Sequence, residues 1–214
     1  MITLWGRLTS SNVQKVVWAL GELGLDYEHI PLGGRYGGNN EPDYLALNPN
    51  GLVPTLRDNG LVVWESHAIV RYLCAEYGSG RIFPSQPAER ALVDQWTDWV
   101  ATTFGPAWNG LFWQLVRTPV PQHDQAGIEK ALTATNRCFD IMEQRLRETP
   151  YLGGARFTYA DIVAGVAMYR WTTMDIERPA RPGVHAWHTR LLARPAFVEA
   201  VNVDYEELRG RLTF

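Results

Sequence analysis

The spacing of hydrophobic and polar positions changes near residue 80. Before that point strand patterns and helix patterns are mixed, and after it only helix patterns occur. Short apolar runs before that point predict strands at residues 2–6, 27–30, 55–56 and 61–64. Apolar residues recur at helical spacing from Val13 to Leu20 and predict a helix that ends at Gly24. Further helices are expected at residues 41–47 and from Ser66 onward. A strand, a helix and a strand in this order predict a right-handed crossover and a parallel strand pair.

Only helical patterns occur from about residue 88 onward. The expected helices cover residues 88–117, 123–147, 158–171, 184–193 and 195–201. Gly105-Pro106 should kink or break the first of them, because proline lacks the N–H group that a helix interior requires. We therefore predict an α/β plus all-α protein, with an N-terminal domain at residues 1–79, a linker at 80–87 and an all-helical domain at 88–214.

A turn, a Val-Pro pair and a hairpin follow one another after residue 48. Asp58-Asn59-Gly60 between two apolar runs is a strong hairpin signal. Pro54 begins the first strand of this hairpin, which is a position where proline is tolerated. Val53 is then the last residue before the strand whose backbone N–H and C=O groups could pair with a peptide-like ligand.

The helix that begins at Ser66 offers a second binding feature. Its first turn has unpaired N–H groups and the positive end of the helix dipole, so it favours a carboxylate. Glu65 beside it could bind an ammonium group. Together with Val53, these residues predict a small peptide that carries an α-amino acid group. An equally consistent interpretation is a hairpin and a helix in which Ser66 only caps and Glu65 is only solvated.

Composition narrows the classes of function. With 46% hydrophobic and 20% charged residues among 214, the chain resembles an ordinary globular protein. Its net charge of −3 gives no reason to expect nucleic acid or an anionic membrane as a partner. No membrane-spanning run, signal peptide or metal site is predicted. Cys74 and Cys138 lie in helical patterns, so we expect two buried, reduced cysteines in a cytoplasmic protein, with a disulfide as the alternative.

Four motifs, in one order over the whole length, resemble those of the cytosolic glutathione S-transferases, which join a thioredoxin-like domain to an all-helical domain. They are Ser10-Ser11-Asn12, Asn48-Pro49-Asn50-Gly51-Leu52-Val53-Pro54, Trp64-Glu65-Ser66-His67-Ala68-Ile69 and Thr158-Tyr159-Ala160-Asp161. The first motif is similar to that of bacterial, serine-type, theta- and zeta-like members. The chain lacks the cysteine that thiol-transferase branches have at this place and the first-strand tyrosine of alpha-, mu- and pi-like members.

The resemblance implies that glutathione is the co-substrate. The bond between Val53 and Pro54 would be cis, and the Val53 backbone would pair with the cysteinyl residue of glutathione. Glu65 and Ser66 would hold the amino and carboxylate groups of the γ-glutamyl residue. These roles match the α-amino acid ligand that the hairpin and the helix start predict.

The resemblance also implies that the catalytic group lies at the start of the first helix. Ser10 is the first candidate, Ser11 is the alternative, and Asn12 would be a second donor. A free thiol has a pKa of about 8.5, so a hydroxyl donor and the positive helix end would favour its thiolate form. In this role Ser10 donates a hydrogen bond and is not a nucleophile; its alternative role is simple capping of the helix.

The second substrate would be a small hydrophobic electrophile bound between the two domains. Trp108 and Phe112 are four residues apart on one helical face and are candidates for its apolar wall, or for core residues. Arg35, Asn39 and Asn40 are candidates for holding the glycyl carboxylate of glutathione.

The family further implies a homodimer and a role in detoxification, and Asp161 is expected to cap a helix. Two other functions stay open. One is a zeta-like glutathione-dependent isomerase, although Asn12-Val13 stands where the zeta pattern has Ser and Cys. The other is a non-catalytic glutathione-binding or stress-regulatory module.

Overall fold

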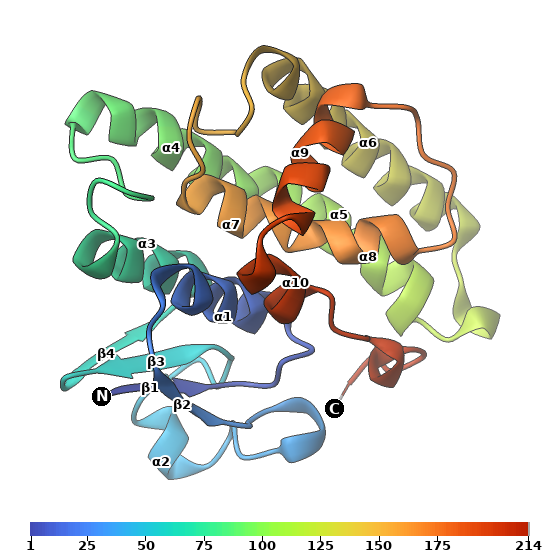
Figure 1. Ribbon diagram of the computed structural model, residues 1–214. Coiled ribbons are helices and arrows are strands. Elements are labelled where there is room, and N and C mark those ends of the chain that lie inside the picture. Colours follow the sequence, from blue (N-terminus) through green and yellow to red (C-terminus); the bar gives the residue numbers. More distant parts are fainter. Residues whose placement is uncertain (214) are drawn as a thin grey trace.

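The computed structural model describes residues 1–213, and its first part is a four-stranded sheet with helices on both faces (Figure 1). The strands are β1 (Ile2–Trp5), β2 (Tyr27–Ile30), β3 (Thr55–Asp58) and β4 (Leu61–Trp64), in the spatial order β2-β1-β3-β4. The pair of β1 and β2 is parallel and the other pairs are antiparallel. The parallel pair and the hairpin of β3 and β4 confirm the sequence-based predictions.

Three helices complete this part: α1 (Ser11–Leu23), α2 (Pro42–Leu45) and α3 (Ser66–Tyr77). Figure 1 shows α1 and α3 side by side between the sheet and the rest of the molecule, with α2 on the opposite face of the sheet. The mixed sheet and its helices form the expected thioredoxin-like arrangement. It brings the starts of α1 and α3 to the same side of the sheet, where the predicted binding residues lie.

The rest of the chain is helical, which confirms the predicted fold class. The helices are α4 (Pro87–Trp99), α5 (Gly105–Phe112), α6 (Gln125–Glu148), α7 (Tyr159–Gly165), α8 (Ala167–Thr173), α9 (Pro182–Leu192) and α10 (Pro195–Val201). Single 3-10 turns cover Gly34–Tyr36, Val120–Gln122 and Glu206–Leu208. Figure 1 shows α10 lying beside α1, so a segment near the end of the chain packs against the first helix.

The helix expected at residues 88–117 is not one regular helix. Wider π-helical turns at Val100–Phe104 and Trp113–Arg117 interrupt it. The first of these turns leads directly into Gly105, where an added Cβ would lie 2.6 Å from the carbonyl oxygen of Val100. The break expected at Gly105-Pro106 is therefore a widened turn that only glycine can close. The helix expected at 158–171 is likewise divided, into α7 and α8, at Val166.

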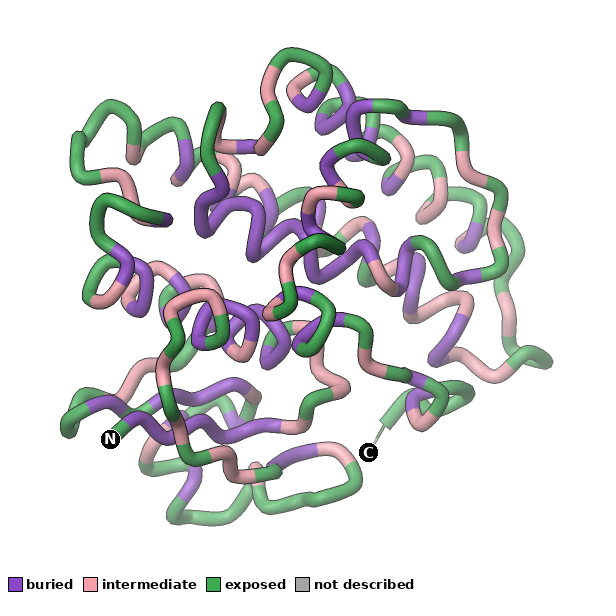
Figure 2. Tube along the Cα trace, in the orientation of Figure 1, coloured by how far each residue is buried: buried purple, intermediate pink, exposed green. Residues whose placement is uncertain are grey.

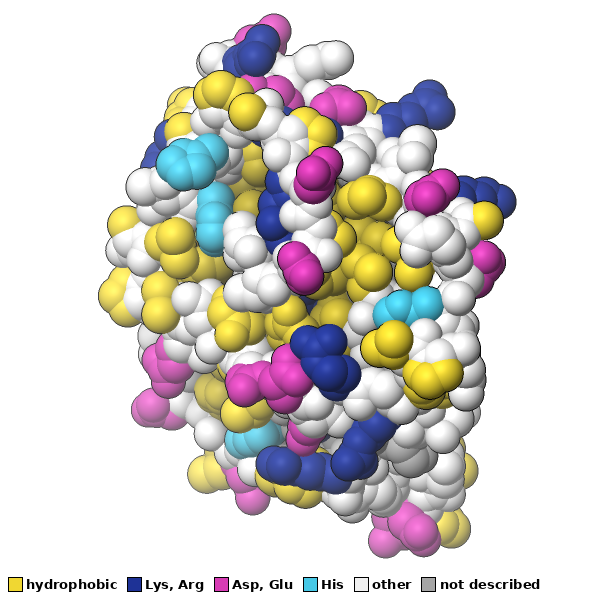
Figure 3. Space-filling view, turned by 90° about the vertical axis from the view of Figure 1, so that its right-hand side faces the viewer, with side chains coloured by type: hydrophobic (Ala, Val, Ile, Leu, Met, Phe, Trp, Pro, Cys, Tyr) yellow, Lys and Arg dark blue, Asp and Glu magenta, His cyan; other side chains and the backbone are white. Residues whose placement is uncertain are grey.

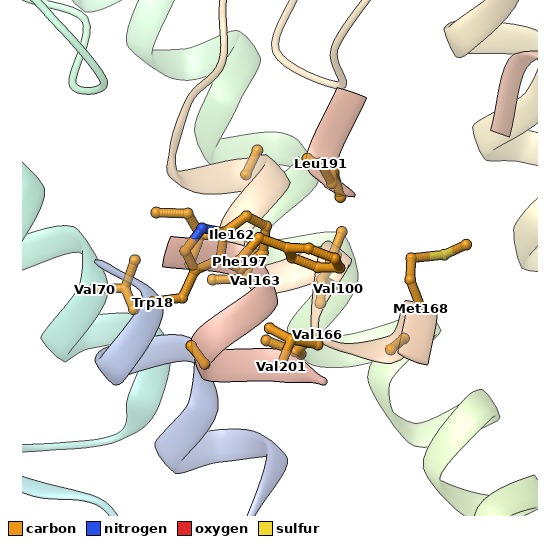
Figure 4. Packing of buried hydrophobic residues seen from close by; sticks show 14 of the residues in the cluster. Trp18, Val70, Val100, Ile162, Val163, Val166, Met168, Leu191, Phe197 and Val201 are labelled. Atoms are coloured by element: carbon orange, nitrogen blue, oxygen red, sulfur yellow. The ribbon is translucent and has the colours of Figure 1, made fainter. Parts of the chain in front are cut away.

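One hydrophobic core extends across both parts of the chain. Trp18 of α1 is fully buried and lies edge-on to Phe197 of α10, with ring centres 4.8 Å apart. In Figure 4 these two rings lie beside Ile162 and Val163 of α7. Every residue of α7 is buried, and Figure 2 shows this continuous buried stretch at the centre of the molecule. The helix that carries the candidate catalytic serines is thus anchored in a core to which the helical part contributes.

Two further expectations can be compared with the structure. Cys74 and Cys138 are both buried and are not paired with each other, as expected for reduced cysteines. No helix among residues 1–213 is both long enough and apolar enough to cross a membrane.

Candidate functional site

The loop before β3 is held in place by two buried polar side chains. Asn48 donates from Nδ2 to the carbonyl oxygen of Leu52 at 2.8 Å and to Oγ1 of Thr55 at 3.1 Å. The Tyr44 hydroxyl donates to the same Leu52 oxygen at 2.6 Å and lies 2.8 Å from the Thr55 hydroxyl. These bonds satisfy backbone groups that a loop leaves unpaired, so they fix the course of the chain up to Val53.

The peptide bond between Val53 and Pro54 is cis, as the family resemblance implied. Pro54 stands directly before β3, so it does not take part in the backbone pairing between β3 and β1. Val53 directly precedes Pro54 and lines a cavity beside the start of α1. The pairing of the Val53 backbone with a ligand stays a prediction.

Glu65 occupies an unusual backbone conformation at the start of α3. Its φ angle is +73°, in a region that residues other than glycine rarely adopt and that costs about 1–3 kcal/mol. Its carbonyl oxygen accepts the first helical bond of α3, from the N–H of Ile69 at 2.9 Å. Such strain is concentrated at functional sites. Here it sets an exposed carboxylate next to the N-terminal end of a helix.

Ser66 belongs to a cluster of polar side chains that joins the starts of α1 and α3. Nζ of Lys15 donates to Oδ1 of Asn12 at 2.9 Å and to Oγ of Ser66 at 3.4 Å. Oγ of Ser66 lies 3.3 Å from the same Asn12 oxygen. In its ammonium form Lys15 can only donate, and that form fixes the Asn12 amide with Oδ1 toward Lys15 and its Nδ2 donors turned away.

The third partner of Lys15 is His67, whose Nε2 lies 3.0 Å from Nζ. The other ring nitrogen, Nδ1, lies 3.1 Å from the carbonyl oxygen of Thr97 in α4. A carbonyl oxygen only accepts, so Nδ1 carries the proton and Nε2 accepts from Lys15. The cluster therefore extends from the start of α1 through α3 to the helical part.

Burial changes the proton affinity of this cluster. It lowers the pKa of Lys15 to about 7, although the nearby Glu65 carboxylate acts in the opposite direction. It also lowers the pKa of His67 to about 3, and the charge of Lys15 adds to that effect. His67 is therefore neutral at physiological pH, whereas Lys15 titrates close to it. A carboxylate bound beside Ser66 would favour the ammonium form of Lys15.

Ser10 and Ser11 lie where α1 begins. Ser10 is the N-cap residue, and its backbone carbonyl accepts the N–H of Gln14 at 2.9 Å. Its side chain makes no capping hydrogen bond, so simple capping does not account for the hydroxyl. Ser11 is the first helical residue. Both serines line the same cavity as Val53.

That cavity has a volume of about 580 Å³ and lies between the two parts of the chain. Its lining from the first part is Arg7, Thr9, Ser10, Ser11, Asn12, Gly33, Gly34, Asn39, Asn40, Gly51, Leu52 and Val53. Its lining from the helical part is Asn109, Phe112, Trp113, Arg117, Arg170, Leu208, Leu212 and Thr213. A ligand of several residues can thus contact the start of α1, the loop before β3 and four helical segments at once.

The structure brings most of the predicted site residues together in two adjoining places. Pro54, Glu65 and Ser66 do not line the cavity, but Ser66 is connected to it through Asn12. The two aromatic candidates both belong to the hydrophobic core, and of the two only Phe112, which is 1% exposed, also lines the cavity.

Only two of the three candidates for holding the glycyl carboxylate line the cavity. Asn39 and Asn40 line the cavity, and Nδ2 of Asn39 donates to the carbonyl oxygen of Gly51 at 2.9 Å. Arg35 does not line this cavity and forms an ion pair with Glu207, with N and O 3.2 Å apart.

Sequence reasoning missed Lys15, His67 and Arg170 as parts of the site. Lys15 carried one signal: it stands one helical turn after Asn12 and directly before the apolar residues Val16 and Val17. Its other partners, Ser66 and His67, come from more than 50 residues further along, which no local pattern shows.

Both parts of the chain match known protein-family models. Residues 9–76 match the model described as the glutathione S-transferase N-terminal domain, and residues 95–195 match the C-terminal domain of the same family. Among similar proteins, glutathione S-transferase GstB of Escherichia coli (strain K12) is 40% identical over 205 residues, which are 95% of this chain and 99% of that protein. Glutathione S-transferase 3 of Zea mays is 35% identical over 207 residues, 94% of this chain and 93% of that protein.

A solved structure has the same fold. The theta class glutathione S-transferase from Xanthomonas axonopodis pv. citri, determined with glutathione bound, has a TM-score of 0.91 to this chain and 48% sequence identity. The match covers 95% of this chain and 98% of that one.

Proposed function

The chain belongs to the glutathione S-transferase family and takes glutathione as its co-substrate, and on this basis we propose that the hydroxyl of Ser10 activates the glutathione thiolate for attack on a small hydrophobic electrophile. One observation carries this proposal: Ser10 stands at the start of α1, its side chain makes no capping hydrogen bond, and the residue lines the cavity. A hydroxyl in that position can donate a hydrogen bond to a bound sulfur.

Glutathione binds, in this proposal, across the two adjoining places of the site. The backbone N–H and C=O of Val53, set by cis Pro54, pair with the cysteinyl residue as an added strand would. Glu65 accepts the γ-glutamyl ammonium group. Ser66 donates to the γ-glutamyl carboxylate, and the N-terminal end of α3 stabilises its charge. The buried Lys15 ammonium adds a positive charge below the same carboxylate.

Activation is the stabilisation of a thiolate. An unperturbed thiol with a pKa of about 8.5 is mostly protonated at neutral pH, and only the thiolate is a good nucleophile. The Ser10 hydroxyl and the positive end of α1 both favour the charged form. Asn12 contributes as a second donor, because the contact of its Oδ1 with Lys15 leaves its Nδ2 group to donate elsewhere. Ser11 is the alternative donor to the sulfur.

The electrophile occupies the part of the cavity formed by the helical part. Trp113 supplies apolar surface there, the buried Phe112 lies beside it, and Asn109 supplies an amide. Asn39 and Asn40, at the other end of the cavity, hold the glycyl carboxylate of glutathione.

The decisive experiment titrates the bound thiol. The ultraviolet absorbance of the thiolate is followed against pH for glutathione bound to the wild type, to Ser10→Ala and to Ser11→Ala. In the wild type the bound thiol should have a pKa at least about one unit below its free value, and Ser10→Ala should remove most of that shift. Conjugation of 1-chloro-2,4-dinitrobenzene at neutral pH should fall about tenfold or more in Ser10→Ala, with glutathione affinity changed less than about threefold.

Ser11→Ala is the matched control, because it removes the same hydroxyl one residue away. A loss confined to Ser11→Ala would transfer the role to Ser11. A wild-type rate in Ser10→Ala, or no depressed thiol pKa in the wild type, would refute the proposed activation.

We further propose that the protein is a homodimer. β4 is an edge strand of the sheet, and it exposes Leu61 and Trp64, while Leu92 on α4 is half exposed. Exposed apolar side chains on an open sheet edge favour association with a second copy. Light scattering of the purified protein should give twice the mass of the chain, and a monomer would contradict the proposal.

A further inference from the structure

Thr9, the residue directly before Ser10, is held by two side chains from the helical part of the chain. Its hydroxyl donates to Oε1 of Glu207, and its carbonyl oxygen accepts from Nη2 of Arg170 at 2.6 Å. These partners lie 198 and 161 positions away along the chain. The loop that leads into α1 is therefore bound, at one residue, through both its side chain and its backbone by α8 and by the turn at Glu206–Leu208.

Arg170 is a firmly held partner. It is 5% exposed, and its guanidinium carbon lies 4.3 Å from the ring centre of Phe112. Burial lowers the pKa of Arg170 to about 9, so the group is still charged at neutral pH. A charged donor forms a stronger hydrogen bond than a neutral one, and a close-packed side chain has few other positions. Arg170 thus fixes the carbonyl oxygen of Thr9.

Glu207 is held on a segment that is anchored to the helical part. Its side chain is 21% exposed. The turn that carries it is anchored by Leu208, which is 2% exposed and belongs to the hydrophobic core. Beyond the turn, the N–H of Gly210 donates to the carbonyl oxygen of Val116 at 2.8 Å. The carboxylate of Glu207 therefore has a defined position.

The neighbours of Thr9 in the loop are held by local bonds. The N–H of Ser10 donates to the carbonyl oxygen of Arg7 at 3.1 Å, and Nε2 of Gln14 in α1 donates to the carbonyl oxygen of Leu8 at 3.0 Å. These bonds come from within the first part of the chain. The two contacts of Thr9 add the restraint that comes from the helical part.

The backbone determines where the Ser10 hydroxyl lies, because its side chain makes no capping hydrogen bond that would fix it. A hydrogen bond weakens steeply as its distance and angle depart from the optimum. Displacement of a reacting group by about 1 Å can lower a rate about a hundredfold. A contact that fixes the backbone directly before Ser10 can therefore decide how well the hydroxyl reaches a bound sulfur.

We propose that Glu207 is a positioning residue, whose hydrogen bond with Thr9, together with that of Arg170, directs the Ser10 hydroxyl at the glutathione sulfur. This inference rests on the proposed function and adds a residue of the helical part to those that activate the thiolate. The alternative role is structural, in which the same contact only joins the two parts of the chain. A structural contact affects stability and leaves the bound thiol unchanged.

The test replaces Thr9 by valine and by serine. Valine keeps the shape and lacks the hydroxyl that donates to Glu207, whereas serine keeps the hydroxyl. In Thr9→Val the pKa of the thiol of bound glutathione, followed by ultraviolet absorbance, should rise by about half a unit or more. The kcat/KM for 1-chloro-2,4-dinitrobenzene should fall about fivefold or more, with glutathione affinity changed less than about twofold. Thr9→Ser should keep both properties of the wild type.

Glu207→Ala removes the acceptor and should have the same two effects. Glu207 also pairs with Arg35, with N and O 3.2 Å apart, and its charge acts on Arg7. The double variant of Thr9→Val and Glu207→Ala isolates the contact with Thr9. If the hydrogen bond carries the effect, the second substitution should change the rate by less than about twofold beyond the first. Fully additive losses would overturn the proposal.

Glu206→Ala is the matched control, because it removes a carboxylate one position earlier. The side chain of Glu206 is 59% exposed and pairs with Arg209. On the face shown in Figure 3, basic and acidic side chains are interspersed, and neither kind forms one continuous area. Loss of one exposed charge from a surface of mixed charge changes the field at the cavity little. The thiol pKa and the rate should therefore stay at wild-type values, and a loss equal to that of Glu207→Ala would overturn the proposal.

The Tm of each variant separates positioning from a structural role. A Thr9→Val protein with a lower Tm but a wild-type thiol pKa and rate would show that the contact only joins the two parts of the chain. Glu207→Ala provides the same comparison from the other side of the hydrogen bond. A wild-type thiol pKa in both variants would refute the positioning role.

Ser10→Ala separates this inference from the proposed function. In that background Thr9→Val should change neither the thiol pKa nor the rate further, because its effect passes through the Ser10 hydroxyl. An undiminished effect there would refute the positioning role and leave the role of Ser10 standing. If Ser10→Ala alone keeps the wild-type thiol pKa, the proposed function is refuted, and the positioning role is refuted with it.

Discussion

Nζ of Lys15 lies 3.0 Å from Nε2 of His67, so an amine and a neutral imidazole share a buried hydrogen bond beneath the starts of α1 and α3. The pKa of each group is lowered, that of Lys15 to about 7 and that of His67 to about 3, chiefly by burial. The charge of Lys15 therefore depends on what binds beside Ser66. This dependence connects ligand binding to a proton.

Binding of S-methylglutathione should take up protons near pH 8. This ligand has no free thiol, and Lys15, with a pKa of about 7, is mostly neutral at that pH. A γ-glutamyl carboxylate beside Ser66 raises the pKa of Lys15, so roughly half a proton or more should be bound per site. Calorimetry in buffers of different ionisation enthalpy measures this number. Uptake that persists in Lys15→Met would exclude Lys15 as its source.

Stability should rise as the pH rises above 7. The folded pKa of Lys15 is about 7 and lies below the value of 10.5 for an unperturbed lysine, so between these values the unfolded chain binds the additional proton. The free energy of unfolding therefore increases with pH in this range, because protons favour the unfolded state. Urea unfolding at pH 7 and pH 9 should show a larger increase in the wild type than in Lys15→Met, and equal increases would disprove the lowered pKa.

Asp161→Ala should destabilise the fold by about 3–5 kcal/mol. The carboxylate of Asp161 is fully buried and accepts from the N–H groups of Leu152 at 3.0 Å and Thr158 at 2.9 Å, and from Nε1 of Trp187 at 2.9 Å. Removal of the carboxylate leaves these donors unpaired inside the core. Urea unfolding measures the loss, and a loss below about 1 kcal/mol would show that other groups or water replace the carboxylate.

Asp140→Ala serves as the control for that measurement. The side chain of Asp140 is 63% exposed and pairs with Arg181, with N and O 2.9 Å apart. An ion pair with one exposed partner contributes little, so its removal should cost about 1 kcal/mol or less.

Glu22→Gln should destabilise the contact between the two parts of the chain by about 1–3 kcal/mol. Glu22 of α1 accepts two hydrogen bonds from Arg194, at 2.7 and 2.6 Å, and a third from Nε1 of Trp18 at 2.9 Å. Glutamine keeps the shape but loses the charge. Thermal unfolding should show a lower Tm, whereas Glu206→Gln, in an exposed pair with Arg209, should leave the Tm unchanged. Equal shifts in the two variants would contradict the importance of the buried pair.

The sheet and the helical part could be predicted from the sequence because their determinants are local. Asn59-Gly60 sets the hairpin of β3 and β4, and Asn59 adopts the positive φ of 48° that such a turn requires. The capping pair of Thr158 and Asp161 likewise forms as predicted, because a capping box spans only four residues. All the residues that determine such a turn or cap lie next to one another in the sequence, so the sequence alone is enough to predict it.

The site could be predicted only in part because several of its contacts join distant segments. Ser10 and Val53 could be named from motifs, but Arg170 meets Thr9 across 161 positions, and nothing near either residue indicates the contact. Trp108 and Phe112 share one helical face, yet Phe112 lines the cavity and Trp108 does not. The spacing predicts that two residues share a face, and the fold decides which of them reaches the cavity.

The close contact between Trp18 and Gly165 limits how this chain can recombine with its relatives. A Cβ at position 165 would lie 2.8 Å from two ring atoms of Trp18, so the indole of α1 fits only against a glycine in α7. A chimera that joins the first part of this chain to the helical part of another family member needs a glycine at that position. One matched pair outside the cavity lining therefore restricts which N-terminal and helical parts can be combined.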